Sequence, residues 1–178
     1  MAAEFIIGGA RSGKSRYAEQ RARAAETDGM RVIYIATATA GDEEMTRRIA
    51  HHRMNRPAHW QTREEPLHLA RRLQAEAAPD ACLLVDCLTL WLANLVFTPA
   101  DHTTENALLQ AETRLLVETL PQLPGRVILV SNEVGWGIVP ADPLSRFFTD
   151  EQGWLNQRVA AVCEQVTLVA AGLPLRLK

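Results

Sequence analysis

The chain has 178 residues, of which 47% are hydrophobic, and a formal net charge of -2. This length is typical of a single domain, here residues 1–178, with a substantial core. The nearly neutral charge gives no reason to expect a nucleic acid or an anionic membrane as the main partner. The longest apolar runs, at 82–85 and 95–97, are too short to span a bilayer, and the N-terminus is unlike a secretory signal.

Three cysteines, Cys82, Cys87 and Cys163, lie in apolar segments and lack the spacing of metal ligands. We therefore expect buried free thiols rather than disulfides or a metal site. Free thiols are typical of a reducing compartment, so we expect a cytoplasmic protein.

Strands and helices are predicted to alternate along the chain. In chain order we expect a strand at 5–7, a helix at 14–26, a strand at 31–36, a helix at 42–55, a short strand at 60–62, a helix at 66–77, a strand at 82–87, helices at 88–96 and 104–120, a strand at 126–131, a helix at 144–164 with a candidate break near Gly153, a strand at 166–170 and a last short strand at 173–177. The strands are continuous apolar runs, which indicates that both faces are covered. The pattern predicts an α/β fold with a mostly parallel sheet and helices on both faces.

A glycine-rich motif follows the first predicted strand and opens the first helix. It matches G-x-x-x-x-G-K-[ST] and consists of Gly8, Gly9, Ala10, Arg11, Ser12, Gly13, Lys14 and Ser15. In such a phosphate loop the backbone N–H groups surround phosphate oxygens, the lysine contacts the β- and γ-phosphates, and the last hydroxyl ligates Mg²⁺. The motif predicts a nucleoside triphosphate site with Lys14 and Ser15 in these roles. The alternative is a glycine turn without a ligand.

Asp86 ends the strand predicted at 82–87, at the carboxyl edge of the sheet where ligands of α/β proteins bind. An acid in this position can hold Mg²⁺ directly or through water. The alternative is an aspartate that caps the following helix.

The segment 42–65 is rich in ionisable groups, including His51, His52, Arg48, Arg53 and Arg56. A histidine beside several arginines suits a phosphate site, where a neutral imidazole can act as base or as nucleophile. A solvated, charged helix explains the same pattern, and the spacing alone favours it. A zinc site is weaker still, because helical zinc ligands usually lie four residues apart.

Several motifs together closely resemble the bifunctional adenosylcobinamide kinase / adenosylcobinamide-phosphate guanylyltransferase family of cobalamin synthesis, over essentially the whole chain. Besides the phosphate loop, they lie at 34–37 (YIAT), 48–53 (RIAHHR), 56–57 (RP), 60–66 (WQTREEP), 86–89 (DCLT), 132–140 (NEVGWGIVP) and 156–157 (NQ). The phosphate loop alone is generic, whereas the runs around His52 and at 132–140 are specific to the family.

The resemblance implies two reactions on one RecA-like P-loop fold. A nucleoside triphosphate, ATP or GTP, phosphorylates adenosylcobinamide, and a guanylyl-histidine then passes GMP from GTP to adenosylcobinamide phosphate. By resemblance the nucleophile is His52, with His51 the weaker candidate, and Lys14 is the other catalytic residue. Mg²⁺ would be held by Ser15 and Asp86. Further nucleotide contacts would be Thr37, Ala38, Thr39, Arg53, Met54, Asn55, Arg56, Glu64 and Asp86. The family also suggests a homotrimer.

The sequence leaves several other features open. The loop at 132–137, with Asn132 and Glu133, is either part of the substrate site or a structural turn. Trp91, Trp136 and Trp154 are expected in the core or at subunit contacts. Thr149 and Trp154 stand where the family often has arginines, which leaves the corrinoid contacts undetermined. A plain P-loop kinase and a non-catalytic nucleotide switch are alternatives, although the base-selective motif Asn-Lys-x-Asp of such switches does not occur in this sequence.

Overall fold

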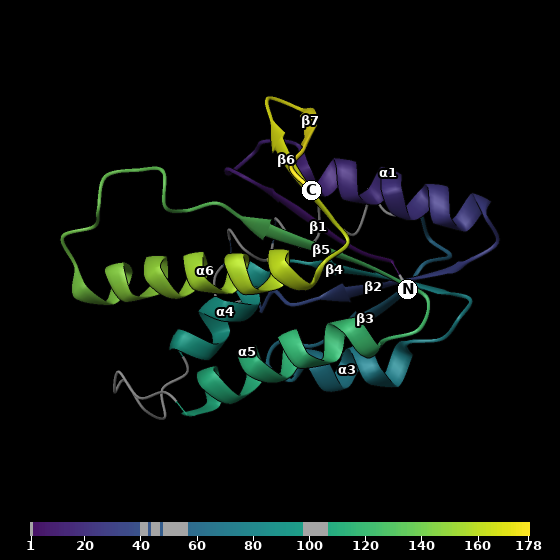
Figure 1. Ribbon diagram of the computed structural model, residues 1–178, viewed down its shortest axis with the longest axis horizontal. Coiled ribbons are helices and arrows are strands. Elements are labelled where there is room, and N and C mark those ends of the chain that lie inside the picture. The colour runs from purple at the N-terminus through teal and green to yellow at the C-terminus, as the bar shows by residue number, and fades with distance from the viewer. Residues whose placement is uncertain (1, 40–42, 44–46, 48–56, 98–106) are drawn as a thin grey trace.

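The computed structural model describes residues 2–39, 43, 47, 57–97 and 107–178. These residues form a seven-stranded sheet in the order β3-β2-β4-β5-β1-β6-β7 (Figure 1). All neighbouring strands are parallel except β6 and β7, which are antiparallel. The strands are β1 Ala2–Gly8, β2 Arg31–Ala36, β3 Gln61–Glu64, β4 Ala81–Asp86, β5 Arg126–Asn132, β6 Gln165–Ala170 and β7 Leu173–Arg176. The prediction of a mostly parallel α/β sheet is therefore confirmed.

Helices cover both faces of this sheet (Figure 1). They are α1 Lys14–Thr27, α3 Leu69–Glu76, α4 Leu88–Phe97, α5 Ala107–Thr119 and α6 Pro143–Val162, with a short 3-10 helix at Leu120–Gln122. Helix α1 packs on one face, where Ile6 of β1 joins a cluster with Ala18 and Ala22. The other helices pack on the opposite face, where Phe5 joins the larger cluster around Trp91. Burial of both faces explains why the strands are continuous apolar runs.

Two helix features differ from the sequence prediction. Helix α3 begins at Leu69 rather than at Pro66. The Glu65 carboxylate accepts the backbone N–H groups of Leu67 and His68, at 3.2 and 2.9 Å, and so holds these residues in a turn before the helix. Helix α6 runs through Gly153 without the candidate break. A glycine inside a helix costs about 0.5–1 kcal/mol, and the burial of Leu155, which lies close to it on the same helix, is worth more.

The three cysteines are buried free thiols, as predicted. Burial raises the pKa of Cys82 and Cys87 to about 11 and that of Cys163 to about 12. Trp91 lies fully in the core, also as predicted, whereas the side chains of Trp136 and Trp154 are exposed.

The helix predicted at 42–55 lies outside the described residues apart from Glu43 and Arg47, and so does the predicted start of α5. None of the helices that the structure describes is long and apolar enough to cross a membrane.

The strand order brings three chain segments to one edge of the sheet. β5 lies between β1 and β4, so the loop after β5 lies between the phosphate loop, which follows β1, and Asp86, which ends β4. Gly8 is in register with Asn132, and Asp86 with Val130. The carboxyl ends of these strands therefore form the edge at which α/β proteins bind ligands.

Candidate functional site

The phosphate loop, residues 8–15, is closely fitted to its surroundings. A Cβ on Gly8 would meet the Val169 carbonyl oxygen at 2.4 Å and the Ser12 Oγ at 2.7 Å. Gly13 has φ 95° and caps α1, which begins at Lys14. Such a positive φ is readily adopted only by glycine. The glycines at both positions are thus required by the backbone, and α1 directs its positive N-terminal end toward the loop.

Two polar side chains of the loop can interact with a bound anion. The Lys14 side chain is buried, and its Nζ donates to the Gly9 carbonyl at 3.0 Å. Burial lowers the pKa of Lys14, while the neighbouring acidic groups of Cys87 and Asp86 act in the opposite direction. The Ser12 Oγ is buried and has no hydrogen-bond partner among the described residues. A phosphate bound in the loop would supply an acceptor for this hydroxyl and a counter-charge for Lys14.

Asp86 is half-buried at the end of β4, as the sequence predicted. The Tyr34 hydroxyl, from neighbouring β2, donates to its Oδ2 at 3.0 Å. This hydrogen bond orients one carboxylate oxygen and leaves the other for a different ligand.

Thr37 lies beside Asp86 and is fully buried. Its hydroxyl donates to the Cys87 carbonyl at 2.7 Å and accepts from the Cys87 N–H at 2.9 Å. The side chain of Asn94, on α4, donates to the carbonyls of Thr37 at 2.8 Å and Pro66 at 3.1 Å. These bonds fix the peptide that follows Asp86 and join the loops after β2 and β3. The hydroxyl and the carbonyl of Thr37 are thus engaged within the fold, and its N–H donates to the Asp86 carbonyl at 3.5 Å, so a nucleotide contact of Thr37 stays a prediction.

A second buried network supports the end of β5. The Ser131 hydroxyl donates to Asn156 Oδ1 at 2.8 Å and accepts from Gln152 Nε2 at 3.0 Å. Both polar backbone groups of Asn132 are held by side chains: its N–H donates to the Thr89 Oγ1 at 2.8 Å, and its carbonyl accepts from Asn156 Nδ2 at 3.1 Å.

This network also reaches the phosphate loop, because the N–H of Glu133, which follows Asn132, donates to the Gly8 carbonyl at 3.0 Å. The end of β5 therefore links α4 and α6 to the first residue of that loop. Thr89, Ser131 and Gln152 were not identified from the sequence as supporting residues. Asn156 is part of the motif at 156–157, and this motif was the only indication in the sequence that the residue has a role.

Comparisons with known proteins identify the family. The model of the family described as cobinamide kinase / cobinamide phosphate guanyltransferase matches residues 4–177. This chain belongs to that family. It is 57% identical over 175 residues to the bifunctional adenosylcobalamin biosynthesis protein CobP of Pseudomonas aeruginosa, covering 98% of this chain and 96% of that protein. It is 41% identical over 182 residues to the corresponding CobU protein of Salmonella typhimurium, covering 98% of each.

The fold is similar to that of a P-loop ATPase. The solved structure of such an ATPase domain matches with a TM-score of 0.52 and 14% sequence identity, covering 94% of this chain and 68% of that chain. At this identity the likeness shows the fold alone, and it confirms the expected RecA-like P-loop architecture.

The nucleotide contacts implied by the cobinamide kinase / guanyltransferase family lie only partly among the described residues. Ala38 is half-buried and Thr39 is exposed, both directly after β2, and Glu64 ends β3 in register with Ala36. All three lie at the carboxyl edge, on the β2 side of Asp86. The remaining contacts lie outside the described residues, so their predicted roles stay predictions; they are His52, Arg53, Met54, Asn55 and Arg56.

The residues at this edge suit Mg²⁺ better than a metal with an all-protein ligand set. Among the described residues, no group of three or more His, Cys, Asp or Glu side chains could hold a metal ion. Mg²⁺ usually takes one or two protein oxygens and completes its shell with phosphate and water. Ser15 at the start of α1 and Asp86 at the end of β4 offer these oxygens on either side of β5.

Proposed function

We propose that this chain phosphorylates adenosylcobinamide and then transfers GMP to the product, giving adenosylcobinamide-GDP. The observation that carries the proposal is one edge of the sheet where a buried Lys14, a partnerless Ser12 hydroxyl (among the described residues) and the oriented carboxylate of Asp86 converge. This arrangement suits a triphosphate, and family membership narrows the acceptor to a cobinamide.

In the kinase step the aminopropanol hydroxyl oxygen attacks the γ-phosphorus, the bond to the leaving nucleoside diphosphate breaks, and the hydroxyl proton is released. Lys14 and the N–H groups of the phosphate loop stabilise the charge that develops on the phosphate oxygens. Asp86 and Ser15 would hold Mg²⁺, which neutralises phosphate charge when bound. Either ATP or GTP can serve in this step.

In the transfer step an imidazole nitrogen of His52 attacks the α-phosphorus of GTP and pyrophosphate leaves, so that a P–N bond forms. A phosphate oxygen of adenosylcobinamide phosphate then attacks this phosphorus and the P–N bond breaks, which frees the histidine. His52 follows β2 along the chain, and this strand ends at Ala36, in register with Asp86. Arg53 and Arg56, close to His52 in sequence, would neutralise charge on the phosphates.

We further propose a cytoplasmic homotrimer. Buried free thiols suit a reducing compartment. Leu173 and Leu175 on the edge strand β7 are exposed, and so is Leu177 directly after it, which suits contact with a second copy of the chain.

Product analysis tests the function. Purified protein is incubated with adenosylcobinamide, Mg²⁺ and either ATP or GTP, and the corrinoids are separated and identified by mass spectrometry. We expect the mass of one added phosphate with either nucleotide and the mass of adenosylcobinamide-GDP only with GTP. Unmodified adenosylcobinamide, in the presence of demonstrable nucleotide binding, would contradict the proposal.

A further inference from the structure

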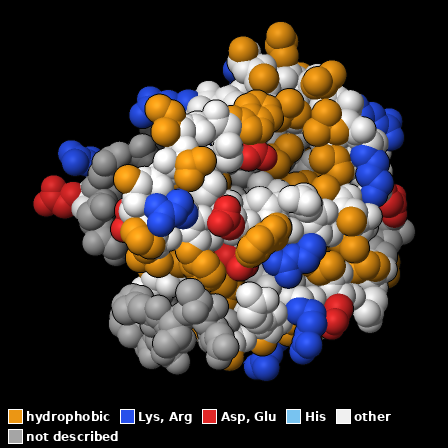
Figure 2. Space-filling view, turned by 60° about the vertical axis from the view of Figure 1, so that its left-hand side comes forward, with side chains coloured by type: hydrophobic (Ala, Val, Ile, Leu, Met, Phe, Trp, Pro, Cys, Tyr) orange, Lys and Arg blue, Asp and Glu red, His pale blue; other side chains and the backbone are white. Residues whose placement is uncertain are grey.

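The loop between β5 and α6, residues 133–142, presents large apolar side chains to solvent. Trp136 is 73% exposed, Ile138 98% and Val139 73%. In Figure 1 this loop extends away from the end of β5 before it returns to α6. Figure 2, which brings this side of the molecule forward, shows many exposed hydrophobic side chains. Contiguous exposed apolar groups of this kind are typical of binding sites.

Hydrogen bonds hold both ends of the loop. At its start the Glu133 N–H donates to the Gly8 carbonyl, and the Gly135 N–H donates to Glu133 Oε1, each at 3.0 Å. At its end Arg146 donates to the carbonyls of Pro140 at 3.1 Å and Ala141 at 2.6 Å. The apolar side chains are therefore presented between two fixed points.

The first of these points is the phosphate loop itself, because Gly8 is its first residue. The other end leads into α6, where Asp142 accepts the Ser145 N–H at 2.7 Å and caps the helix. Since β5 lies between β1 and β4, the loop emerges between the phosphate loop and Asp86. An acceptor whose hydroxyl approaches a bound triphosphate at this edge has its remaining bulk close to this loop.

We propose that Trp136, Ile138 and Val139 form an apolar surface that binds the corrin ring of the cobinamide substrate. The inference rests on the proposed function. The corrin ring is broad and carries methyl groups around its rim, so it can cover these three side chains together. A flat indole beside two branched aliphatic side chains offers apolar contact to such a ring without a fixed hydrogen-bond pattern. The substrate is thereby held by its ring while its short hydroxyl-bearing arm reaches the phosphates.

Steady-state kinetics of the kinase step test this surface in the full chain with Mg²⁺. Wild type is compared with Trp136→Ala, Ile138→Ser and the control Glu118→Ala. Glu118 is exposed near the end of α5, which leads to the start of β5, so it lies away from the carboxyl edge of the sheet. We expect Trp136→Ala to raise the KM for adenosylcobinamide about tenfold to a hundredfold, the loss corresponding to one buried large side chain. Ile138→Ser should act in the same direction. The KM for the nucleotide and formation of the GMP adduct from GTP alone should stay within about twofold of wild type, and Glu118→Ala should match wild type throughout.

Three results would overturn the inference. The first is an unchanged KM for adenosylcobinamide in both loop variants. The second is an equal loss of nucleotide affinity, since it would mean that the variants distort the phosphate loop. The third is a smaller assembly by light scattering together with a general loss of activity, because the surface would then be a contact between copies of the chain. Failure of the wild type to phosphorylate adenosylcobinamide would instead contradict the proposed function, so the two failures are distinguishable.

Discussion

The single hydroxyl of Thr37 holds both polar backbone groups of Cys87. It donates to the carbonyl at 2.7 Å and accepts from the N–H at 2.9 Å. Because Cys87 follows Asp86 directly, this pair fixes the backbone from which the candidate Mg²⁺ carboxylate projects. Thr37 directly follows β2 and Cys87 directly follows β4, and these two strands are neighbours in the sheet (Figure 1). We therefore expect Thr37 to act as a positioning residue for this candidate metal site.

Substitution of Thr37 tests this role. We expect Thr37→Val to unfold about 1–3 kcal/mol more easily, because two buried hydrogen bonds are lost, and to need a several-fold higher Mg²⁺ concentration for half-maximal nucleotide binding. Thr37→Ser should restore the Mg²⁺ dependence. Both quantities follow from a denaturant titration and a Mg²⁺ titration of nucleotide fluorescence.

Thr113→Val is the matched control for this experiment. Thr113 is also fully buried, and its hydroxyl donates to the Leu109 carbonyl at 2.8 Å within α5. It should lose stability without any change in Mg²⁺ dependence. An unchanged Mg²⁺ requirement in Thr37→Val would show that the pair is only structural.

Loss of the Asp86 carboxylate should lower kcat more than loss of the Tyr34 hydrogen bond that orients it. We expect Asp86→Asn to lower kcat for the kinase step about a hundredfold or more, because a divalent cation contributes several kcal/mol to charge stabilisation. Tyr34→Phe removes one hydrogen bond to Oδ2 and should cost about tenfold or less. Kinetics at saturating Mg²⁺ give both values. Equal effects of the two substitutions would contradict a metal-binding role for Asp86.

Two adjacent glycines of the phosphate loop should respond differently to alanine. A Cβ on Gly8 would lie 2.4 Å from a backbone oxygen, whereas one on Gly9 would meet nothing within 4 Å. We expect Gly8→Ala to destabilise the fold by about 1–3 kcal/mol and Gly9→Ala to leave the free energy of unfolding nearly unchanged. Any loss of nucleotide affinity in Gly9→Ala would then come from a changed contact with the bound phosphate and not from a less stable fold. Thermal unfolding decides the comparison, and similar melting temperatures for both variants would contradict the described geometry of the loop.

Glu151 should make the protein less stable as the pH rises above 4.5. Its carboxylate is buried on α6, its Oε2 has no hydrogen-bond partner among the described residues, and Arg158 lies 3.9 Å away. Burial raises the pKa of Glu151 above its ordinary value of 4.5. The native state therefore holds this proton more tightly than the unfolded chain, and stability falls as the pH rises from 4.5 to the raised native pKa.

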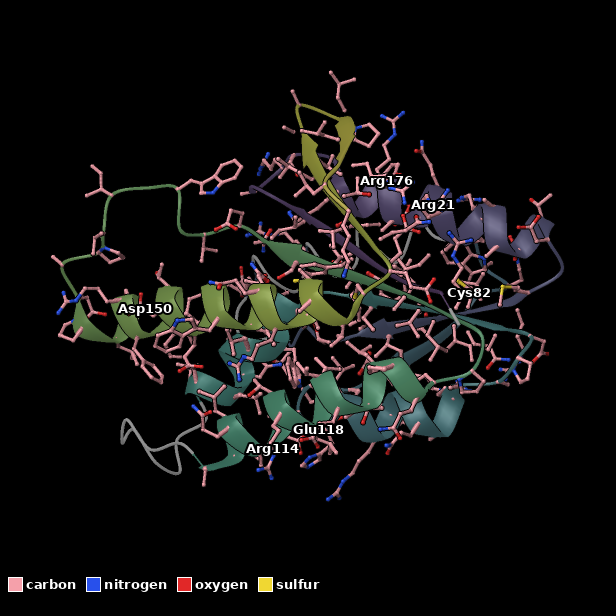
Figure 3. All side chains as sticks on the ribbon, viewed as in Figure 1. Arg21, Cys82, Arg114, Glu118, Asp150 and Arg176 are labelled. Carbon is pink, nitrogen blue, oxygen red and sulfur yellow. The ribbon has the colours of Figure 1, made fainter. Side chains whose placement is uncertain are left out.

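Glu151→Gln removes this proton equilibrium. We expect the free energy of unfolding of the variant, relative to wild type, to increase as the pH rises above 4.5. Parallel denaturant titrations at several pH values measure the difference. Asp150→Asn, one residue away and exposed on the same helix (Figure 3), is the control. A difference between Glu151→Gln and wild type that does not vary with pH would contradict a raised pKa.

The phosphate loop and the strand-end Asp86 could be predicted from the sequence because each is a local signal, a glycine motif or an acid at the end of an apolar run. The helix features at Glu65 and Gly153 could not, since they depend on side-chain hydrogen bonds and on burial. Asn94 and Ser131 were also missed. Each is an ordinary polar residue in sequence, and its role arises only because the strand order brings distant segments together.

The histidine mechanism rests on family resemblance. Its most direct test is the intact mass of the purified protein after incubation with GTP and Mg²⁺, for wild type, His52→Ala and His51→Ala. The account predicts one acid-labile GMP on wild type and on His51→Ala, and none on His52→Ala. An unmodified wild-type protein that demonstrably binds GTP, or an adduct that persists in His52→Ala, would contradict it.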